Sequence, residues 1–213
     1  MLCVKNASIK GLYKSLYKQY GKQSWWPAEA PFEVMVGAIL TQNTAWSNVE
    51  KAIANLRRAG VLEPLLLDEI SQPELAELIR PSGYFNIKAR RLKEFCCWFV
   101  ARGGLEGLSK ADTLTLRNDL LAVHGIGPET ADDILLYAFK RPVFVIDTYT
   151  RRLFTRTGLA TGEEKYDILR IMVEEALDCN VDDMNEFHGL IVKHAKEHCR
   201  VKPLCECCPV SLP

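Results

Sequence analysis

A short turn with two glycines is the first candidate for chemistry in this chain. Gly125, Ile126, Gly127 and Pro128 separate two segments with helical patterning within Leu120 to Tyr137. Gly125 and Gly127 can adopt backbone angles that other residues avoid, and Pro128 suits the first turn of a helix. Such a turn presents N–H groups at a helix N-terminus, where hydrogen bonds and the helix dipole favour phosphate oxygens. We expect a phosphate-binding hairpin with Ile126 pointing inward; a plain tight turn between helices is the alternative.

The second candidate is the carboxylate of Asp147. It follows the apolar residues Val145 and Ile146 and precedes an expected helix from Thr148 to Arg156. Asp is a preferred residue at a helix N-cap, and that position would hold the carboxylate rigidly. A rigid carboxylate can stabilise a developing positive charge and can orient or deprotonate water.

A third candidate is a concentration of cysteines near the end of the sequence. Four of the eight cysteines lie within the last 15 residues: Cys199, Cys205, Cys207 and Cys208. So local a cluster does not suit a disulfide framework and favours a metal centre.

Together, the sequence motifs around the hairpin and Asp147 resemble those of a known family. The pattern hydrophobic-X-Gly-hydrophobic-Gly-X-X-Thr-Ala is followed by Val145-Ile146-Asp147-Thr148-Tyr149-X-Arg151-Arg152. This pairing resembles the helix-hairpin-helix, the Gly/Pro-rich loop and the Asp of the endonuclease III superfamily of DNA glycosylases. Residues 36–44 resemble the family's helix and Gln-bearing loop that insert into DNA, and residues 83–89 resemble its Gly-aromatic-X-X-Lys-Ala segment. The ending, with His188, Lys196 and the cysteines, is most similar to the branch that includes a bacterial 3-methyladenine DNA glycosylase.

The resemblance implies that the partner is double-stranded DNA containing a damaged base. An enzyme of this kind rotates the damaged nucleotide out of the duplex and fills the gap that it leaves. We expect Leu40 to act as a wedge and Asp147 to be the catalytic residue, because cleavage of an N-glycosidic bond builds positive charge on the sugar. The expected DNA-binding residues are Gly125, Ile126, Gly127 and Thr130 of the hairpin, and Gln42 and Asn43 of the inserted loop.

Glu129 departs from the family pattern at an informative place. Bifunctional members have a lysine two residues beyond the second hairpin glycine, and its amine attacks the sugar to form a Schiff base. A carboxylate cannot form an imine, so we predict a monofunctional glycosylase that leaves an abasic site. A displaced lysine such as Lys140 is the alternative, although its spacing does not favour it.

Three tryptophans suggest which base is removed. Trp25, Trp26 and Trp46, with Phe32 nearby in sequence, could form an electron-rich pocket in which a cationic alkylated purine would stack favourably. Core packing beside Pro27 is the competing interpretation. The pocket and the branch resemblance favour 3-methyladenine, with oxidised pyrimidines or mismatches as the second choice.

The cysteine tail resembles the family's [4Fe–4S] loop. Cys199, Cys205 and Cys208 provide three ligands, with five and then two residues between them, whereas the family has six and then two. The family pattern would place the fourth cysteine beyond Pro213. A chain that continues, an unusual ligand and the absence of a cluster all remain open. Cys207 is a spare cysteine, and zinc bound by the three cysteines with His198 is a further alternative.

The elements that position these residues are predicted to be helices. Apolar residues recur at helical spacing along most of the chain, and no segment of strand length alternates strictly between apolar and polar residues. Residues 141–147 are predicted to be a connector. Helix starts are expected at Ser109 to Asp112 and at Asp182-Asp183. We therefore predict an all-α, two-lobed helical DNA glycosylase fold. Residues 32–140 would form a helical barrel lobe with the helix-hairpin-helix at 120–137, residues 1–31 plus 141–198 a second helical lobe, and residues 199–213 the iron–sulfur loop.

Composition narrows the functional classes. Hydrophobic residues are 48% and charged residues 25%, and no run has the length of a membrane span. The N-terminal residues do not resemble a secretion signal, so we expect a cytoplasmic monomer without a membrane partner. Positive and negative side chains number 27 each, so the net charge does not itself predict DNA binding. A non-enzymatic helix-hairpin-helix DNA-binding protein and an endonuclease III-like glycosylase with lyase activity remain alternatives.

Overall fold

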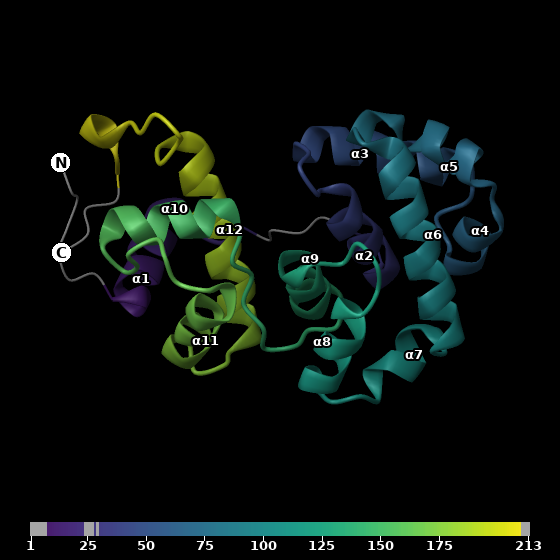
Figure 1. Ribbon diagram of the computed structural model, residues 1–213. Helices are drawn as coiled ribbons and strands as arrows, with labels where there is room; N and C mark the ends of the chain where they lie inside the picture. The colour runs from purple at the N-terminus through teal and green to yellow at the C-terminus, as the bar shows by residue number, and fades with distance from the viewer. Residues whose placement is uncertain (1–7, 24–27, 29, 210–213) are drawn as a thin grey trace. The chain divides into compact units, whose positions relative to one another are not determined.

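The computed structural model describes residues 8–23, 28 and 30–209, and these form two compact units. One unit contains residues 8–23 and 140–209, and the other contains residues 28–139. The described residues are largely helical and include no β-strand, so the prediction of an all-α fold is confirmed (Figure 1). In this part of the chain, none of the helices combines the length and the apolar character that crossing a membrane would require.

The unit of residues 28–139 contains most of the helices. In chain order they are α2 (Pro31–Leu40), α3 (Trp46–Arg58), α4 (Pro64–Glu69), α5 (Gln72–Leu78), the 3₁₀ turn η1 (Arg80–Ser82), α6 (Phe85–Ala101), α7 (Gly104–Ser109), α8 (Thr113–Leu121), α9 (Pro128–Asp133) and the π-helix η2 (Ile134–Ala138).

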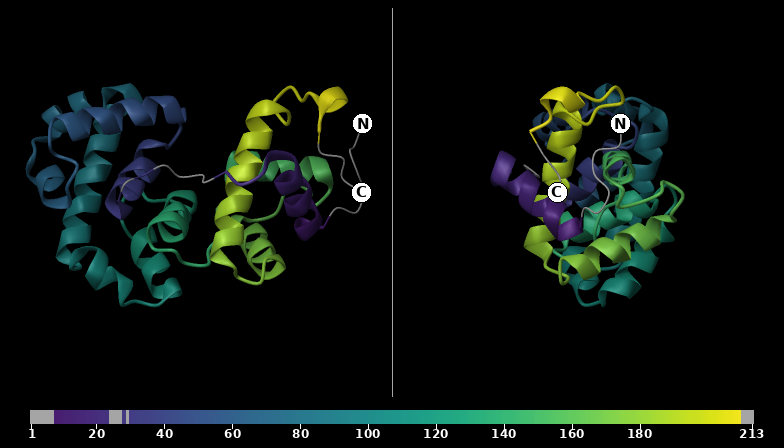
Figure 2. Two further views of the ribbon diagram at one scale, coloured as in Figure 1. Left: turned by 180° about the vertical axis from the view of Figure 1, so that it is seen from behind. Right: turned by 90° about the vertical axis from the view of Figure 1, so that its left-hand side faces the viewer.

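Helix α2 forms the core of this unit. Every residue from Glu33 to Leu40 is buried, as expected for a helix that is apolar all round. It packs against α3, α6, α9 and η2. The long helix α6 packs against α4 and α5, and the back view in Figure 2 shows it in teal beside these shorter helices.

The hairpin segment has recognisable caps. Asp112 caps α8 as predicted, and its carboxylate accepts hydrogen bonds of 3.0 Å from the N–H groups of Leu114 and Thr115. After α9 the chain widens into η2, where the N–H of Phe139 donates to the carbonyl of Ile134 at 3.2 Å. All five residues of η2 are buried, and η2 packs on α2.

The other unit contains α1 (Ile9–Tyr20), α10 (Thr148–Thr157), α11 (Tyr166–Ala176), α12 (Val181–Glu197) and the 3₁₀ turn η3 (Cys205–Cys207). Helix α12 packs on α1 and α10, with Phe187 between Phe144 and Phe154. The prediction that this helix starts at Asp182-Asp183 was slightly wrong. Asn180 is the cap, because its side chain accepts the N–H of Asp183 at 3.0 Å, and the two acidic residues lie in the first turn.

Candidate functional site

The two glycines of the hairpin differ in backbone conformation and in the space available for a side chain. Gly125 has a φ of +85°, which disfavours other residues, and a Cβ there would lie 2.5 Å from the side chain of Arg91. Gly127 is the N-cap of α9 in an extended conformation, and a Cβ there would have no neighbour within 4 Å. In the part of the chain that the structure describes, the N–H groups of both glycines lack hydrogen-bond partners. Ile126 is buried, as expected of an anchor.

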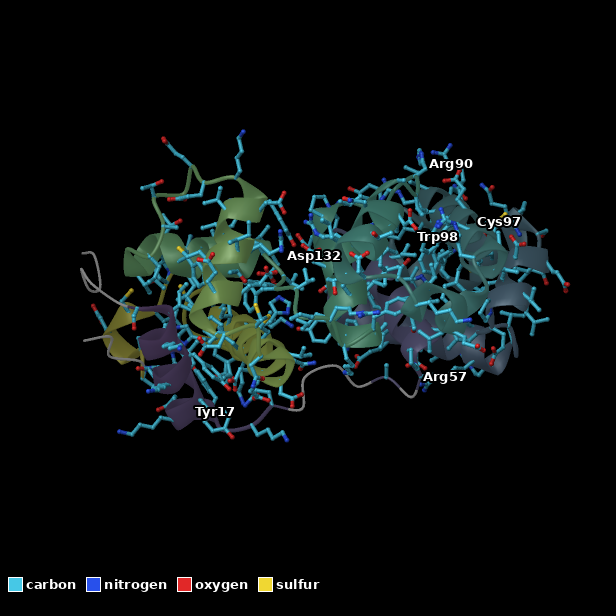
Figure 3. All side chains as sticks on the ribbon, turned by 90° about the horizontal axis from the view of Figure 1, so that it is seen from below. Tyr17, Arg57, Arg90, Cys97, Trp98 and Asp132 are labelled. Atoms are coloured by element: carbon cyan, nitrogen blue, oxygen red, sulfur yellow. The ribbon has the colours of Figure 1, made fainter. Side chains whose placement is uncertain are left out.

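A buried ion pair joins the two helices of the hairpin. Arg117 on α8 donates from Nε to Oδ1 of Asp132 at 2.7 Å, and from Nη2 to Oδ2 at 3.1 Å. Asp132, labelled in Figure 3, is fully buried, and Arg117 is nearly so. The turn is therefore presented by two helices that are fixed to each other.

The predicted inserted loop lies beside the hairpin, within the same unit. Gln42 is half-buried, and its Nε2 donates to the carbonyl of Gly125 at 3.0 Å and to Oγ1 of Thr130 at 2.9 Å. Thr130 is buried, with its hydroxyl turned toward Gln42. Asn43 is exposed, with a φ of +53°. The structure therefore brings together Gln42 and Thr130, which are 88 residues apart in the sequence.

Asp147 lies in the other unit, as the N-cap of α10. Its Oδ1 accepts the backbone N–H of Thr150 at 2.7 Å, so the predicted capping role is confirmed. Its side chain is 12% exposed. Burial raises the pKa of Asp147, but the hydrogen bonds and charge of His188 and the N–H of Thr150 outweigh burial and hold the pKa below its usual value.

His188 is a candidate positioning residue that the sequence analysis did not assign to the site. It is a buried residue of α12, and its Nε2 lies 3.6 Å from Oδ2 of Asp147. Asp147 and His188 are 41 positions apart in the sequence. No local motif could therefore have revealed that the two side chains lie close together.

The predicted base pocket is only partly described. Trp25 and Trp26 lie outside the described residues. Trp46 is half-buried at the start of α3, and its Nε1 donates to Oε1 of Glu50 at 3.0 Å. Glu129, which stands where bifunctional relatives have a lysine, is exposed near the start of α9.

The three predicted cysteine ligands border one cavity of about 50 Å³. Cys199 is buried, Cys208 is half-buried and Cys205 is exposed, while the side chain of Cys207 lies outside the described residues. Nη1 of Arg156 donates to Sγ of Cys199 at 3.3 Å. The described cysteine, histidine and acidic side chains do not already form a group that could hold a metal ion.

His198 adds a nitrogen to the same cavity. Its Nδ1 is buried, and within the described part of the chain it has no hydrogen-bond partner. Three sulfurs and one such nitrogen are suitable donors for an iron–sulfur cluster or for zinc. The residues therefore fit a metal centre by donor type.

Comparisons with known proteins agree with this geometry. Residues 36–178 match the family described as HhH-GPD superfamily base excision DNA repair protein. A Methanocaldococcus jannaschii protein named "Putative DNA repair glycosylase" is 48% identical over 206 residues, which cover 95% of this chain and 94% of that protein. Endonuclease III of Thermotoga maritima is 30% identical over 182 residues, covering 84% of this chain and 79% of that protein.

A solved structure is also similar. The H. pylori 3-methyladenine DNA glycosylase bound to 1,N6-ethenoadenine has a TM-score of 0.79 and 31% identity, covering 89% of this chain and 98% of that one. The resemblance to the endonuclease III superfamily, first seen in the motifs, is confirmed. The chain therefore belongs to the HhH-GPD superfamily of base excision DNA repair proteins.

Proposed function

We propose that this DNA glycosylase rotates a damaged base out of duplex DNA and hydrolyses its N-glycosidic bond with water, using Asp147 as the catalytic carboxylate. The observation that carries the proposal is the environment of Asp147. Its carboxyl group is nearly buried, yet the N–H of Thr150 and the nearby His188 favour its charged form. An ionised carboxylate in a site with little water is suited to stabilising positive charge.

The proposed reaction begins with the hairpin on DNA phosphate. The N–H groups of Gly125 and Gly127 would donate hydrogen bonds to phosphate oxygens. Unstacking of the damaged nucleotide costs a few kcal/mol, and damage lowers this cost. Gln42 would then hydrogen-bond to the orphaned base on the opposite strand. Neither step requires a side chain of the protein to gain or lose a proton.

Bond cleavage would then depend on Asp147. As the glycosidic bond lengthens, positive charge grows on the sugar, and a carboxylate beside it lowers the energy of that state and orients the attacking water. Oδ1 is engaged by the N–H of Thr150, and His188 faces Oδ2. His188 would act through Asp147, as a residue that fixes the direction of the second oxygen.

Glu129 supports hydrolysis without strand cleavage. The position carries a carboxylate, and a carboxylate cannot attack the sugar to form a Schiff base. With water as the nucleophile, the product is an abasic site in an intact strand. Borohydride reduction during turnover should therefore trap no covalent protein–DNA adduct, and a trapped adduct would contradict the monofunctional assignment.

An alkylated purine is the proposed substrate, with 3-methyladenine as the representative. The similar H. pylori protein is named as a 3-methyladenine DNA glycosylase. A cationic base would also gain from stacking on an aromatic ring such as that of Trp46. Oxidised pyrimidines and mismatches are the alternative substrates, and the lesion panel below separates them.

The cavity at the end of the chain is the proposed site of a [4Fe–4S] cluster. Cys199, Cys205 and Cys208 would hold it, with His198 as a candidate for the remaining ligand. Such a cluster supplies structural support for the loop that contains Arg200 and Lys202, since glycosidic hydrolysis transfers no electron. Iron and sulfide in the purified protein, with an absorption band at about 400 nm, support the cluster, whereas bound zinc in a colourless protein refutes it.

The decisive experiment pairs a lesion panel with two Asp to Asn changes. Duplexes with 3-methyladenine, oxidised pyrimidines or mismatches are assayed for base release, with and without alkali to reveal abasic sites. Asp147→Asn should abolish release but keep DNA affinity and the folded structure, because Asn is an equally good helix cap. Asp112→Asn is the matched control: it also alters a capping carboxylate, on α8, and should remain active.

Each outcome of this experiment has a clear meaning. Release from alkylated duplexes only supports the proposed substrate, and release from oxidised pyrimidines favours the alternative. Persistent release by Asp147→Asn refutes the role of Asp147. DNA binding by the unmodified protein without any release would indicate a binding protein in place of an enzyme.

A further inference from the structure

The helix α6 contacts the loop that carries Gln42. The contacts lie near both ends of this loop and at its centre. We call residues 41–45, which join α2 to α3, the insertion loop. Lys88 and Arg91 of α6 make these contacts, and residues three apart lie on the same face of a helix. The reaction described above uses neither side chain.

Lys88 joins Leu40, the last residue of α2, to Thr44 near the far end of the insertion loop. It is 1% exposed, and its Nζ donates to the carbonyl of Leu40 at 2.7 Å, to Oγ1 of Thr44 at 2.8 Å and to the carbonyl of Ser82 at 2.7 Å. All three acceptors are uncharged. Burial and the positive charge of Arg91 lower the pKa of Lys88 to about 8. A buried amine with no carboxylate partner is costly, which favours a specific role over simple packing.

Arg91 contacts the centre of the insertion loop. Its Nη1 donates to Oε1 of Gln42, whose Nε2 donates in turn to Gly125 and Thr130 of the hairpin. The aliphatic part of Arg91 occupies the space where a Cβ on Gly125 would lie. Its Nε is buried and has no hydrogen-bond partner among the described residues. The position of Arg91 against Gln42 therefore leaves its Nε–H group without a hydrogen bond among the described residues.

These contacts occupy most of the hydrogen-bonding capacity of the Gln42 amide. Both N–H groups donate to the hairpin, and one lone pair of Oε1 accepts from Arg91. The other lone pair of Oε1 remains available to accept a hydrogen bond. While the contacts hold, a base that has lost its partner could donate an N–H to Gln42 but could not accept one from it.

We infer that Lys88 and Arg91 are positioning residues, which hold the insertion loop so that Gln42 presents its amide oxygen to the orphaned base. The inference rests on the proposed function, since it requires that a base be rotated out of a duplex. Ordering Gln42 before DNA binds removes the entropic cost of fixing a long side chain at that moment. Arg91 contributes to the rate through Gln42.

A double-mutant cycle tests the link between Arg91 and Gln42. We expect Arg91→Met and Gln42→Ala each to lower kcat/KM for base release about tenfold, the order expected for one charge-assisted hydrogen bond. The double variant should be no slower than Gln42→Ala alone, because Arg91 acts through the amide. Circular dichroism establishes that each variant is folded.

Arg90→Met is the matched control. It removes the same charge from the adjacent position of α6, where the side chain is 53% exposed (Figure 3) and contacts His124 and Glu94 instead of Gln42. Its effect should add to that of Gln42→Ala, because a charge that attracts DNA at long range does not act through the amide.

A second substrate separates positioning from general damage to the protein. When an abasic analogue lies opposite the lesion, no orphaned base is available to Gln42. On this duplex Arg91→Met should release the base nearly as fast as the unmodified protein. Lys88→Met, and Thr44→Ala as a milder change that keeps the amine, should show the same dependence on the opposite base.

The outcomes distinguish the inference from the function on which it rests. Additive losses for Arg91→Met and Gln42→Ala, or equal losses on both duplexes, overturn the role of Arg91. Equal losses on both duplexes for Thr44→Ala overturn the role of Lys88. No release from any lesion by the unmodified protein overturns the proposed function itself.

Discussion

Replacing Arg117 by methionine should strongly destabilise the unit of residues 28–139, which contains the hairpin and is called the hairpin unit below. The change leaves the carboxylate of Asp132 fully buried and removes the hydrogen bonds of 2.7 and 3.1 Å that both of its oxygens accept. Removing one partner of a buried ion pair costs about 3–5 kcal/mol, because the other charge stays buried after its ionic partner has gone. A domain of this kind has a total stability of about 5–15 kcal/mol, so the loss would be a large fraction.

Urea unfolding followed by circular dichroism measures this loss. With a slope of about 1–3 kcal/mol per molar urea, the midpoint should fall by on the order of 1–5 M. The double variant Arg117→Met with Asp132→Leu should recover much of the loss, because two apolar side chains of similar size leave no buried charge. Lys110→Met is the control, since it breaks an exposed pair with Glu106 and should not shift the midpoint measurably. A small shift for Arg117→Met, or no recovery in the double variant, would refute the reasoning.

Three further results are expected. Gly125→Ala should cost about 1–2 kcal/mol in unfolding free energy, because φ at this position is +85°, whereas Gly127→Ala, with open space around its Cβ, should cost clearly less; equal losses in urea unfolding would contradict the difference. The folded-state pKa of Asp147 lies below the ordinary value of 3.8, so its charge stabilises the fold above that pH and the stabilisation is lost as the pH falls through the folded-state pKa. The stability gap between the unmodified protein and Asp147→Asn should therefore narrow in acid, and a gap that does not change with pH would speak against the pKa direction. Burial raises the pKa of Cys96 to about 12, so iodoacetamide at neutral pH should modify exposed Cys97 and spare Cys96, as mass spectrometry of peptides can establish.

Local features of the fold could be predicted from the sequence because their causes are local. Asp112 and Asp147 were expected to begin helices, and both accept N–H groups of the first turn. The φ of Gly125 and the burial of Ile126 follow the expectation for a tight turn with an apolar anchor. Capping and turn formation depend on neighbouring residues, so a short sequence window contains the information.

Contacts between distant segments could not be predicted in this way. His188 of α12 reaches Asp147, while Lys88 and Arg91 of α6 reach Leu40 and Gln42. A buried lysine or histidine in a helical pattern has the same appearance in sequence as an exposed one. Which side chains meet depends on how the helices pack, and no single segment determines that.

The π-helix η2 sets a constraint on length in the hairpin unit. An α-helix turns about 100° per residue, so the extra residue in the wide turn shifts the helical phase of the residues after it relative to the hairpin before it. Deleting one residue from Ile134–Ala138 would restore regular α-helical pairing but rotate one side of the deletion relative to the other. Either the buried face on α2 or the pairing of α9 with α8 would then be lost. We therefore expect relatives of this chain to tolerate changes of residue type here far better than changes in chain length.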